Sequence, residues 1–272
     1  MTVVPGIENR ILFHKAGCRK RGMTVRMPIN FSYFISSTPR SGSSLLAEAL
    51  ESTRIAGNPK EYFDPNFEDY WLDHLAISTD TEYFAKILPA GTTPNGVFSA
   101  KVHWHQFLHL TKKLRLVLDD GMSDIELLQR MFPDLRYVYV TRRDKVRQAV
   151  SYYKAIQTGI WWSIPANANG ETRPPATAPA PLFDFEKIDH WVGRLAEFES
   201  SWRRHFERLG VEPFEVVYED FVGTYESTIL AILRYLDLPV SEGLKAAPPR
   251  LQIQADEVSE EWVHRYHVLK RL

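Results

Sequence analysis

The segment most suited to chemistry is a short polar turn that reads Pro39-Arg40-Ser41-Gly42-Ser43-Ser44. Aromatic and β-branched residues over 31–37 predict a strand before it, and apolar residues at helical spacing from Leu45 predict a helix after it. Backbone N–H groups in such a turn, and the positive end of the helix dipole, favour an anion. Arg40 adds a charged planar donor, the serines add hydroxyl donors, and Gly42 lets the backbone approach closely. The turn therefore predicts an anion-binding site.

This turn differs from the nucleotide-binding P-loop, which has the pattern G-x-x-x-x-G-K followed by Ser or Thr. The early glycine of that pattern is missing, and Ser43 occupies the position of its lysine. A site for a triphosphate with magnesium is therefore disfavoured. The alternative to an anion site is an ordinary turn in which a serine caps the helix. Arg40 and a second basic strand end favour the anion site.

That second basic strand end lies later in the chain. Residues 135–141 (LRYVYVT) form the clearest strand-like run, and Arg142-Arg143 follow it directly. Ser151 lies about two turns into the helix predicted next. Because ligands of open α/β sheets bind at the carboxyl ends of the strands, these residues predict a second anion contact. The alternative is that one or both arginines pair with Asp144 or with other surface acids.

The elements that must position these residues alternate between strands and helices. Further strands are predicted over residues 98–104 and 214–218, and helices over 125–131, 142–157, 184–209 and 224–236, with a short helix near the C-terminus. Asp184 is a suitable N-cap for the longest helix, and Gly210 a suitable stop. This order predicts an α/β protein with a central, mainly parallel sheet covered by helices.

The chain is expected to form one domain over residues 29–272. Residues 1–28 form a basic extension that we expect to be poorly ordered, with Met23 and Met27 as alternative starts. Residues 163–181 are rich in Pro and Ala and predict a long loop, either a functional lid or an idle insertion.

Composition excludes several classes of protein. The 272 residues carry 33 Lys and Arg against 34 Asp and Glu, a net charge of -1 that argues against a general nucleic-acid binder. The single cysteine, Cys18, excludes a disulfide within the chain and a multi-cysteine zinc site. No apolar run approaches the ~20 residues of a membrane-spanning helix, and no secretory pattern opens the chain. We therefore expect a cytoplasmic protein without a transmembrane segment.

The turn at residues 39–44 resembles the 5′-phosphosulfate loop of sulfotransferases that use 3′-phosphoadenosine 5′-phosphosulfate (PAPS). Its Arg version, followed by Leu-Leu, is similar to the bacterial family typified by mycobacterial trehalose 2-sulfotransferase. Similar segments continue in the family's order over residues 33–266, at 57–63, 94–97, 101–104, 148–151, 155–158, 254–256 and 261–263. Because the segments share this order, the chain is identified as a member of the family.

This resemblance implies a P-loop-containing, three-layer, sulfotransferase-like fold. It also implies PAPS as co-substrate, adenosine 3′,5′-bisphosphate as product, no metal, and a homodimer. The loop residues Arg40, Ser41, Gly42, Ser43 and Ser44 would hold the 5′-phosphosulfate and stabilise charge on the leaving phosphate. Arg142 or Arg143 would hold the 3′-phosphate together with Ser151. Lys101 would be a further cation, the alternative being a solvent-exposed lysine at a strand end.

The resemblance also assigns Glu61 as the base that deprotonates the acceptor hydroxyl. Burial and the like charge of a phosphosulfate would raise the pKa of this carboxyl towards neutrality. The alternative is a surface glutamate beside Lys60.

The family suggests a hydroxyl of a carbohydrate or glycolipid as the acceptor. The side chains expected beside it are Pro39, Asn58, Pro59, Tyr62, Phe63 and Trp104. For each aromatic residue taken singly, core packing is the alternative. The trehalose enzyme has Gln and Glu where this chain has Pro39 and Asn58, which argues against trehalose as the substrate. Ile253 replaces an Arg that precedes Gln-Ala-Asp in the family, which removes one possible phosphate contact.

The clustered histidines His103, His105 and His109 could form a metal site, but core or pocket-wall positions are favoured because no acidic companion motif accompanies them. Two other functions stay as alternatives to the sulfotransferase. One is a P-loop kinase or NTPase, which needs magnesium for nucleotide binding. The other is a non-catalytic nucleotide- or glycan-binding module, which would tolerate loss of Glu61.

Overall fold

A computed structural model describes residues 29–118, 121–161, 180–240, 246–248 and 256–271. The basic extension 1–28 and most of the predicted loop 163–181 lie outside the described residues. No helix in these ranges is long and apolar enough to cross a membrane.

The centre of the molecule is a four-stranded sheet in which every neighbouring pair of strands is parallel, in the order β2-β1-β3-β4. The strands are β1 (Phe31–Ser37), β2 (Val97–His103), β3 (Leu135–Thr141) and β4 (Phe214–Val217). The predicted strands are confirmed, with ends that agree within a residue. The expected α/β class with a parallel sheet is therefore confirmed.

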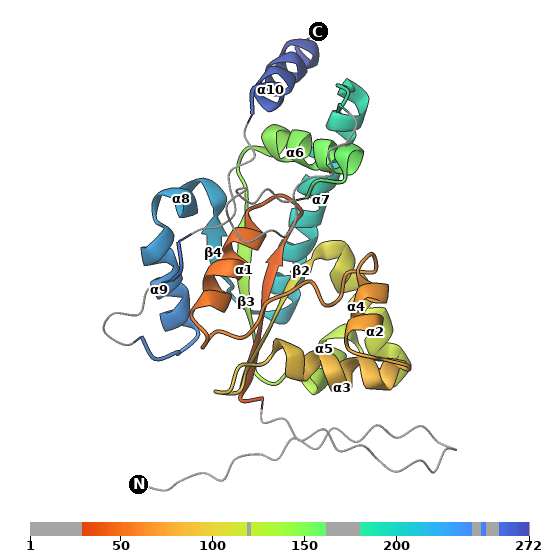
Figure 1. The fold of residues 1–272 in the computed structure, drawn as a ribbon, viewed down its shortest axis with the longest axis vertical. Coiled ribbons are helices and arrows are strands. Elements are labelled where there is room, and N and C mark those ends of the chain that lie inside the picture. Colours follow the sequence, from red (N-terminus) through yellow and green to blue (C-terminus); the bar gives the residue numbers. More distant parts are fainter. Residues whose placement is uncertain (1–28, 119–120, 162–179, 241–245, 249–255, 272) are drawn as a thin grey trace, which may run out of the picture.

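Helices join the strands and cover both faces of the sheet (Figure 1). They are α1 (Ser43–Ser52), α2 (Glu68–His74), α3 (Asp80–Gly91), α4 (Trp104–Val117), α5 (Asp124–Met131), α6 (Lys145–Thr158), α7 (Phe185–Leu209), α8 (Tyr218–Gly223), α9 (Tyr225–Tyr235) and α10 (Glu257–Lys270). The sequence did not lead us to expect α2, α3, α4 or α8. The longest helix begins and ends as predicted: the Asp184 side chain accepts from the N–H of Lys187, and Gly210 has a φ of 64°.

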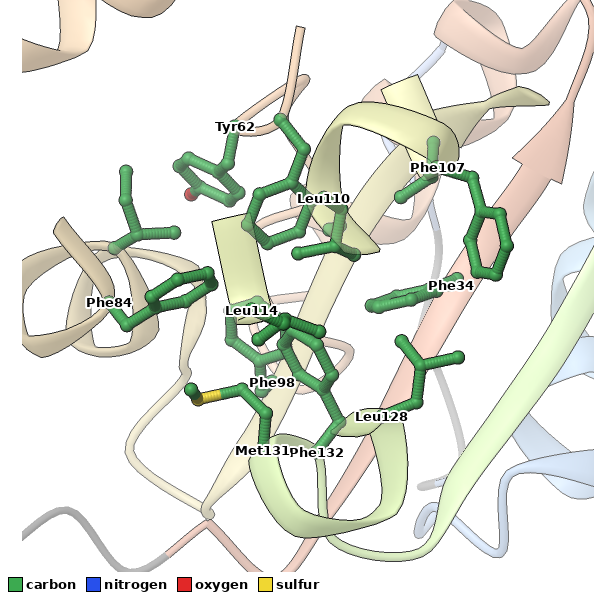
Figure 2. Close-up of a cluster of buried hydrophobic side chains, with 14 of the residues drawn as sticks. Phe34, Tyr62, Phe84, Phe98, Phe107, Leu110, Leu114, Leu128, Met131 and Phe132 are labelled. Carbon is green, nitrogen blue, oxygen red and sulfur yellow. The ribbon is translucent and has the colours of Figure 1, made fainter. Parts of the chain in front are cut away.

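Two hydrophobic cores lie on opposite faces of the sheet because successive strand residues point to opposite sides. Tyr33 and Ile35 of β1 pack with side chains of α1, α8 and α9. Phe34, between them in sequence, joins an aromatic core built from α3, α4, α5 and α7. Figure 2 shows Phe34 and Phe98 of the sheet facing Leu114 and Phe132. Helices, sheet and helices thus form the predicted three layers.

A third cluster of buried side chains lies apart from the sheet, where α6, α7 and α10 pack together. Figure 1 shows α6 and α10 beyond the carboxyl edge of the sheet. The helix that follows β3 is therefore supported by the C-terminal helix, and its first turn lies at the mouth of the sheet.

One histidine of the aromatic core gives the fold a measurable dependence on pH. His205 of α7 is 1% exposed, and burial lowers its pKa to about 4, with Arg208 contributing. Between about pH 6.5 and pH 4 the unfolded chain binds a proton that the folded chain excludes, so acidification favours unfolding.

We expect this group alone to remove about 3 kcal/mol of stability between pH 7 and pH 4. In His205→Phe the free energy of unfolding should fall less steeply over that range, as measured by urea denaturation at several pH values. His264→Gln, at an exposed position on α10, is the control and should keep the wild-type slope. Equal slopes in wild type and His205→Phe would contradict the prediction.

Candidate functional site

The carboxyl ends of the strands meet at one edge because the sheet is parallel. Ser37 at the end of β1 is in register with His103 at the end of β2, and Thr141 of β3 is in register with Val217 of β4. The polar turn after β1 and the two arginines after β3 therefore lie at neighbouring strand ends. This is where open parallel sheets bind their ligands.

The turn after β1 is held in an unusual backbone conformation. Arg40 has a φ of 63° and Gly42 a φ of 87°, both in the left-handed region. For Arg40 this conformation costs about 1–2 kcal/mol, and such strain concentrates at functional sites. Gly42 is the N-cap of α1 and offers no side-chain oxygen, so no N-cap side chain covers the first amides of that helix.

Two hydrogen-bond donors beside this turn are buried without a partner among the described residues. They are Oγ of Ser41, whose residue is fully buried, and Nε of Arg142. Each buried donor left unsatisfied costs about 1–3 kcal/mol. Both donors, and the amides at the start of α1, suit an anionic group.

Arg40 and Arg142 converge on the same place. Arg40 donates from Nε to Oγ of Ser151 on α6 at 2.9 Å, and from its terminal nitrogen to the carbonyl of Trp161. Arg142 donates to the carbonyl oxygen of Arg40 at 3.1 Å. Burial, with the charge of Arg142, lowers the pKa of Arg40 to about 10, and burial also lowers the pKa of Arg142. Both side chains therefore stay charged at neutral pH while partly withdrawn from water.

Arg143 is placed differently from its neighbour. Its guanidinium forms a two-nitrogen pair with Asp220, of which the Nη1–Oδ1 contact is 3.0 Å, and the side chains are 60% and 59% exposed. Arg143 therefore pairs with a surface acid, as the alternative above expected, but its partner is Asp220 and not Asp144. The structure groups Arg142, and not the guanidinium of Arg143, with Arg40 and Ser151.

Glu61 is brought to the site by a segment that runs beside β2. Lys60 forms a parallel bridge with Ala100, which sets Glu61 next to Lys101. The Nζ of Lys101 lies 2.6 Å from Oε1 of Glu61 and donates to Oγ of Ser44 in the turn at 2.7 Å. Lys101 is 5% exposed, so the alternative of a solvent-exposed lysine is wrong. It joins the Glu61 carboxylate to the turn after β1.

Two further side chains hold the Glu61 carboxylate. Gln106 donates from Nε2 to Oε2 of Glu61 at 2.5 Å and to Oδ2 of Asp64 at 2.7 Å. The Nε2 of His103 lies 3.7 Å from Oε2 of Glu61, while its Nδ1 is 2.9 Å from Oγ of Ser37. Glu61 is therefore part of a buried polar network and not a surface glutamate beside Lys60.

The pKa of Glu61 is lowered in this arrangement, whereas a raised pKa is expected for this carboxyl beside a phosphosulfate. Burial does raise the pKa, but Lys101, His103 and Gln106 outweigh burial and lower it to about 2. Burial also lowers the pKa of His103 to about 3, against the opposing charge of Glu61. At neutral pH the carboxylate is ionised and the imidazole is neutral.

The aromatic residues expected beside the acceptor are mostly core residues. Phe63 is fully buried and Tyr62 is 2% exposed, both within the aromatic core of the sheet face. Trp104 is half-buried and packs edge-on against Trp202 at 5.1 Å between ring centroids. The structure favours the packing alternative for Tyr62 and Phe63, since neither offers a surface to a ligand.

The other three residues expected beside the acceptor have backbone contacts. Pro39 is buried, and its carbonyl accepts from Gln148 at 2.7 Å. Asn58 is half-buried and donates from its side chain to the carbonyl of Ala90 at 3.0 Å, and Pro59 after it is buried. Asn58 and Pro59 lie three and two residues before Glu61, in the segment that carries the carboxylate.

Several residues of the site were not singled out from the sequence. Gln106 follows His103 by three residues and forms a capping box with it, a spacing that could have indicated its inward position. Gln148 lies in a segment that the resemblance matched, but its contacts with the turn were not expected. Tyr218 and Glu219 follow β4, and only their place after a strand could have drawn attention to them.

The histidine cluster forms no metal site in the part of the chain that the structure describes. There, no group of three or more His, Cys, Asp or Glu side chains is arranged to hold an ion. His103 belongs to the Glu61 network, His105 is half-buried beside it, and His109 pairs with Glu68 at 2.8 Å.

Comparison with known proteins identifies the family of the chain. The sequence model of the Stf0 sulphotransferases matches residues 32–268. Two trehalose 2-sulfotransferases are similar: that of Mycobacterium tuberculosis is 28% identical over 86% of this chain and 93% of its own, and that of Mycolicibacterium smegmatis is 30% identical over 86% and 94%. A sulfotransferase domain from the olefin synthase of Synechococcus PCC 7002 covers 84% of this chain and 82% of its own, at 16% identity and a TM-score of 0.38. The chain belongs to the Stf0 sulphotransferase family.

Proposed function

We propose that this sulfotransferase moves the sulfuryl group of PAPS to a hydroxyl of a carbohydrate or glycolipid acceptor, with Glu61 as the general base. The single observation that carries the donor assignment is the pair of buried, unpartnered donors at Ser41 and Arg142 beside the uncapped start of α1. A donor with a phosphosulfate and a separate phosphate satisfies both, because its two anionic groups can occupy the turn and the Arg142 side at once.

The contacts divide between the two anionic groups. The turn residues Arg40 to Ser44 and the amides of α1 bind the 5′-phosphosulfate. Arg142 and Ser151 bind the 3′-phosphate, and Arg40, which contacts Ser151, lies between the two groups. Arg143 is left outside because Asp220 neutralises it at the surface. Charged hydrogen bonds of this kind are about twice as strong as neutral ones.

The transfer forms a bond between the acceptor oxygen and sulfur while the bond from sulfur to the bridging phosphate oxygen breaks. The acceptor proton passes to Glu61, and the leaving adenosine 3′,5′-bisphosphate takes the electron pair. Charge on the leaving phosphate is stabilised by Arg40, the loop amides and Lys101. Catalysis of this kind depends on positioning and electrostatic stabilisation.

The low pKa of Glu61 is compatible with this role because Lys101 is shared. A negative charge in the turn attracts the ammonium group of Lys101 towards Ser44. Its ion pair with Glu61 is thereby weakened, because electrostatic attraction at these short distances falls as the separation grows. Loss of that pair raises the pKa of Glu61, so the carboxylate becomes a stronger base when the donor is bound.

The acceptor is proposed from the two relatives, whose names describe sulfation of trehalose. They support a small carbohydrate. Trehalose itself is not proposed, because Pro39 and Asn58 differ from the residues of the trehalose enzyme. Pro39 opens the turn after β1, and Asn58 lies in the segment that carries Glu61. Ile253, where the family has an Arg, lies outside the described residues.

Glu61→Gln tests the base. We expect transfer of radiolabelled sulfate from PAPS to oligosaccharide or glycolipid acceptors to fall by about 10²–10⁴-fold, because the amide cannot accept the proton. Affinity for adenosine 3′,5′-bisphosphate should be kept. Glu51→Gln is the matched control, since Glu51 pairs with Lys60 at the surface and should leave turnover unchanged. Near-normal turnover of Glu61→Gln would refute the role, and binding without transfer to any acceptor in wild type would favour the binding-module alternative.

Thermal shift distinguishes a PAPS enzyme from a kinase or NTPase. Adenosine 3′,5′-bisphosphate at 100 times its Kd should stabilise the protein by about 2.7 kcal/mol and raise Tm by several degrees. ATP with magnesium should raise it much less, because the turn lacks the P-loop lysine. A larger shift with ATP and magnesium would reverse the assignment.

The two arginines after β3 should differ in effect. Arg142→Ala should weaken binding of adenosine 3′,5′-bisphosphate by about ten- to a hundredfold, as expected for a lost charged hydrogen bond. Arg143→Ala should change it by less than about threefold, because its guanidinium is paired with Asp220 and exposed. Isothermal calorimetry measures both, and a larger loss in Arg143→Ala would show that the assignment of the 3′-phosphate is reversed.

A further inference from the structure

The residues at the start of α8 contact both halves of the anion site. Tyr218, Glu219 and Asp220 directly follow β4, the outermost strand next to β3. Each of the three side chains contacts a residue at the strand ends. The tripeptide is outside the residues assigned to the donor, and its contacts point to a positioning role.

The Tyr218 ring lies between the turn after β1 and the arginine after β3. A Cβ added to Gly42 would lie 3.0 Å from Cε2 and 3.3 Å from Cγ of this ring and would overlap Cδ2. The same ring also contacts Arg142, whose guanidinium carbon lies 4.7 Å from the ring centroid. One rigid ring thus touches the backbone that forms the 5′ side and the cation that serves the 3′ side.

Glu219 holds the backbone of the second strand end. Its carboxylate accepts from the N–H of Arg143 at 3.1 Å and from the N–H of Asp144 at 3.2 Å, at the start of α6. These bonds hold the segment after Arg142 to the start of α8. The Tyr218 ring and the Glu219 carboxylate therefore restrain the same arginine from its side chain and from its backbone.

We propose that Tyr218 is a positioning residue that fixes the distance between the Gly42 turn and Arg142, so that one ligand can engage both anionic contacts at once. The inference rests on the proposed PAPS site. A ring is suited to this work because it has few rotatable bonds and attracts a cation over its face. Gly42 is required at its position partly because only a residue without a side chain leaves room for the ring.

The test compares ligands that use one or both contacts. Dissociation constants are measured for adenosine 3′,5′-bisphosphate, adenosine 5′-monophosphate and adenosine 3′-monophosphate, by calorimetry or by competition. In Tyr218→Met, which fills a similar volume without a ring, we expect the advantage of the bisphosphate over the better monophosphate to fall by roughly tenfold. Tyr218→Phe should keep the wild-type advantage, since the ring remains.

Two controls separate this role from general destabilisation. Val222→Ala alters an exposed side chain of the same helix without touching the arginines, and it should leave the advantage unchanged. Tyr218→Leu repeats the test if Tyr218→Met has a lowered Tm without ligand. In a double-mutant cycle, Tyr218→Met should have little further effect on the bisphosphate advantage when Arg142→Ala is already present. The free-energy changes of two substitutions are not additive when one residue acts through the other.

The outcomes are distinct. An unchanged bisphosphate advantage in both Tyr218→Met and Tyr218→Leu, with wild-type binding intact, would overturn the positioning role and leave the donor assignment standing. Equal loss in Tyr218→Phe and Tyr218→Met would also overturn it, because the hydroxyl rather than the ring would then matter. Failure of the wild-type protein to prefer the bisphosphate over the monophosphates would overturn the PAPS proposal itself, and this inference with it.

Discussion

Lys101 joins the two halves of the site, and the buried ion pair it makes with Glu61 constrains the residues around it. Withdrawing an ammonium group and a carboxylate from water is costly unless they remain paired and hydrogen-bonded. Ser44 and Gln106 supply the remaining bonds, and the bridge between Lys60 and Ala100 keeps the pair in register. The polar turn after β1 and the Glu61 carboxylate are therefore electrostatically coupled through a single side chain.

The second constraint is the concentration of positive charge at the carboxyl edge. The side chains of Arg40 and Arg142 are both partly buried, and burial is the main reason that the pKa of each is lowered. Arg143, by contrast, is paired with Asp220 at the surface. Leaving Nε of Arg142 without a partner among the described residues costs folding energy, and a bound anion of the kind proposed above would recover that cost.

Much of the framework could be predicted from local patterns. Residues 135–141 and the long helix from Asp184 to Gly210 carry clear periodicity and caps, so their bounds were correct. The helices after β2 and β4 were missed: residues 104 and 218, which begin them, were assigned to the preceding strands, and residues 218–223 are too few to show a helical period. Arg40, Ser151, Glu61 and Lys101 were expected in one site and are neighbours. Tyr62 and Phe63 were expected beside a ligand and are core residues, since an aromatic side chain in a motif serves packing equally well.

The chemistry of single residues was therefore readable from the chain alone: a basic, serine-rich turn after a strand, two arginines after another, and an acid in a matched segment. Only the tertiary structure decided which charges remain available. Arg142 and Arg143 are adjacent in sequence, yet Asp220, 77 residues after Arg143, pairs with one and leaves the other facing the turn. The pKa of Glu61 was likewise decided by Lys101 and Gln106, 45 residues away in the second case. Electrostatic energies depend on distance in space and on burial, and neither quantity is a local property of a sequence.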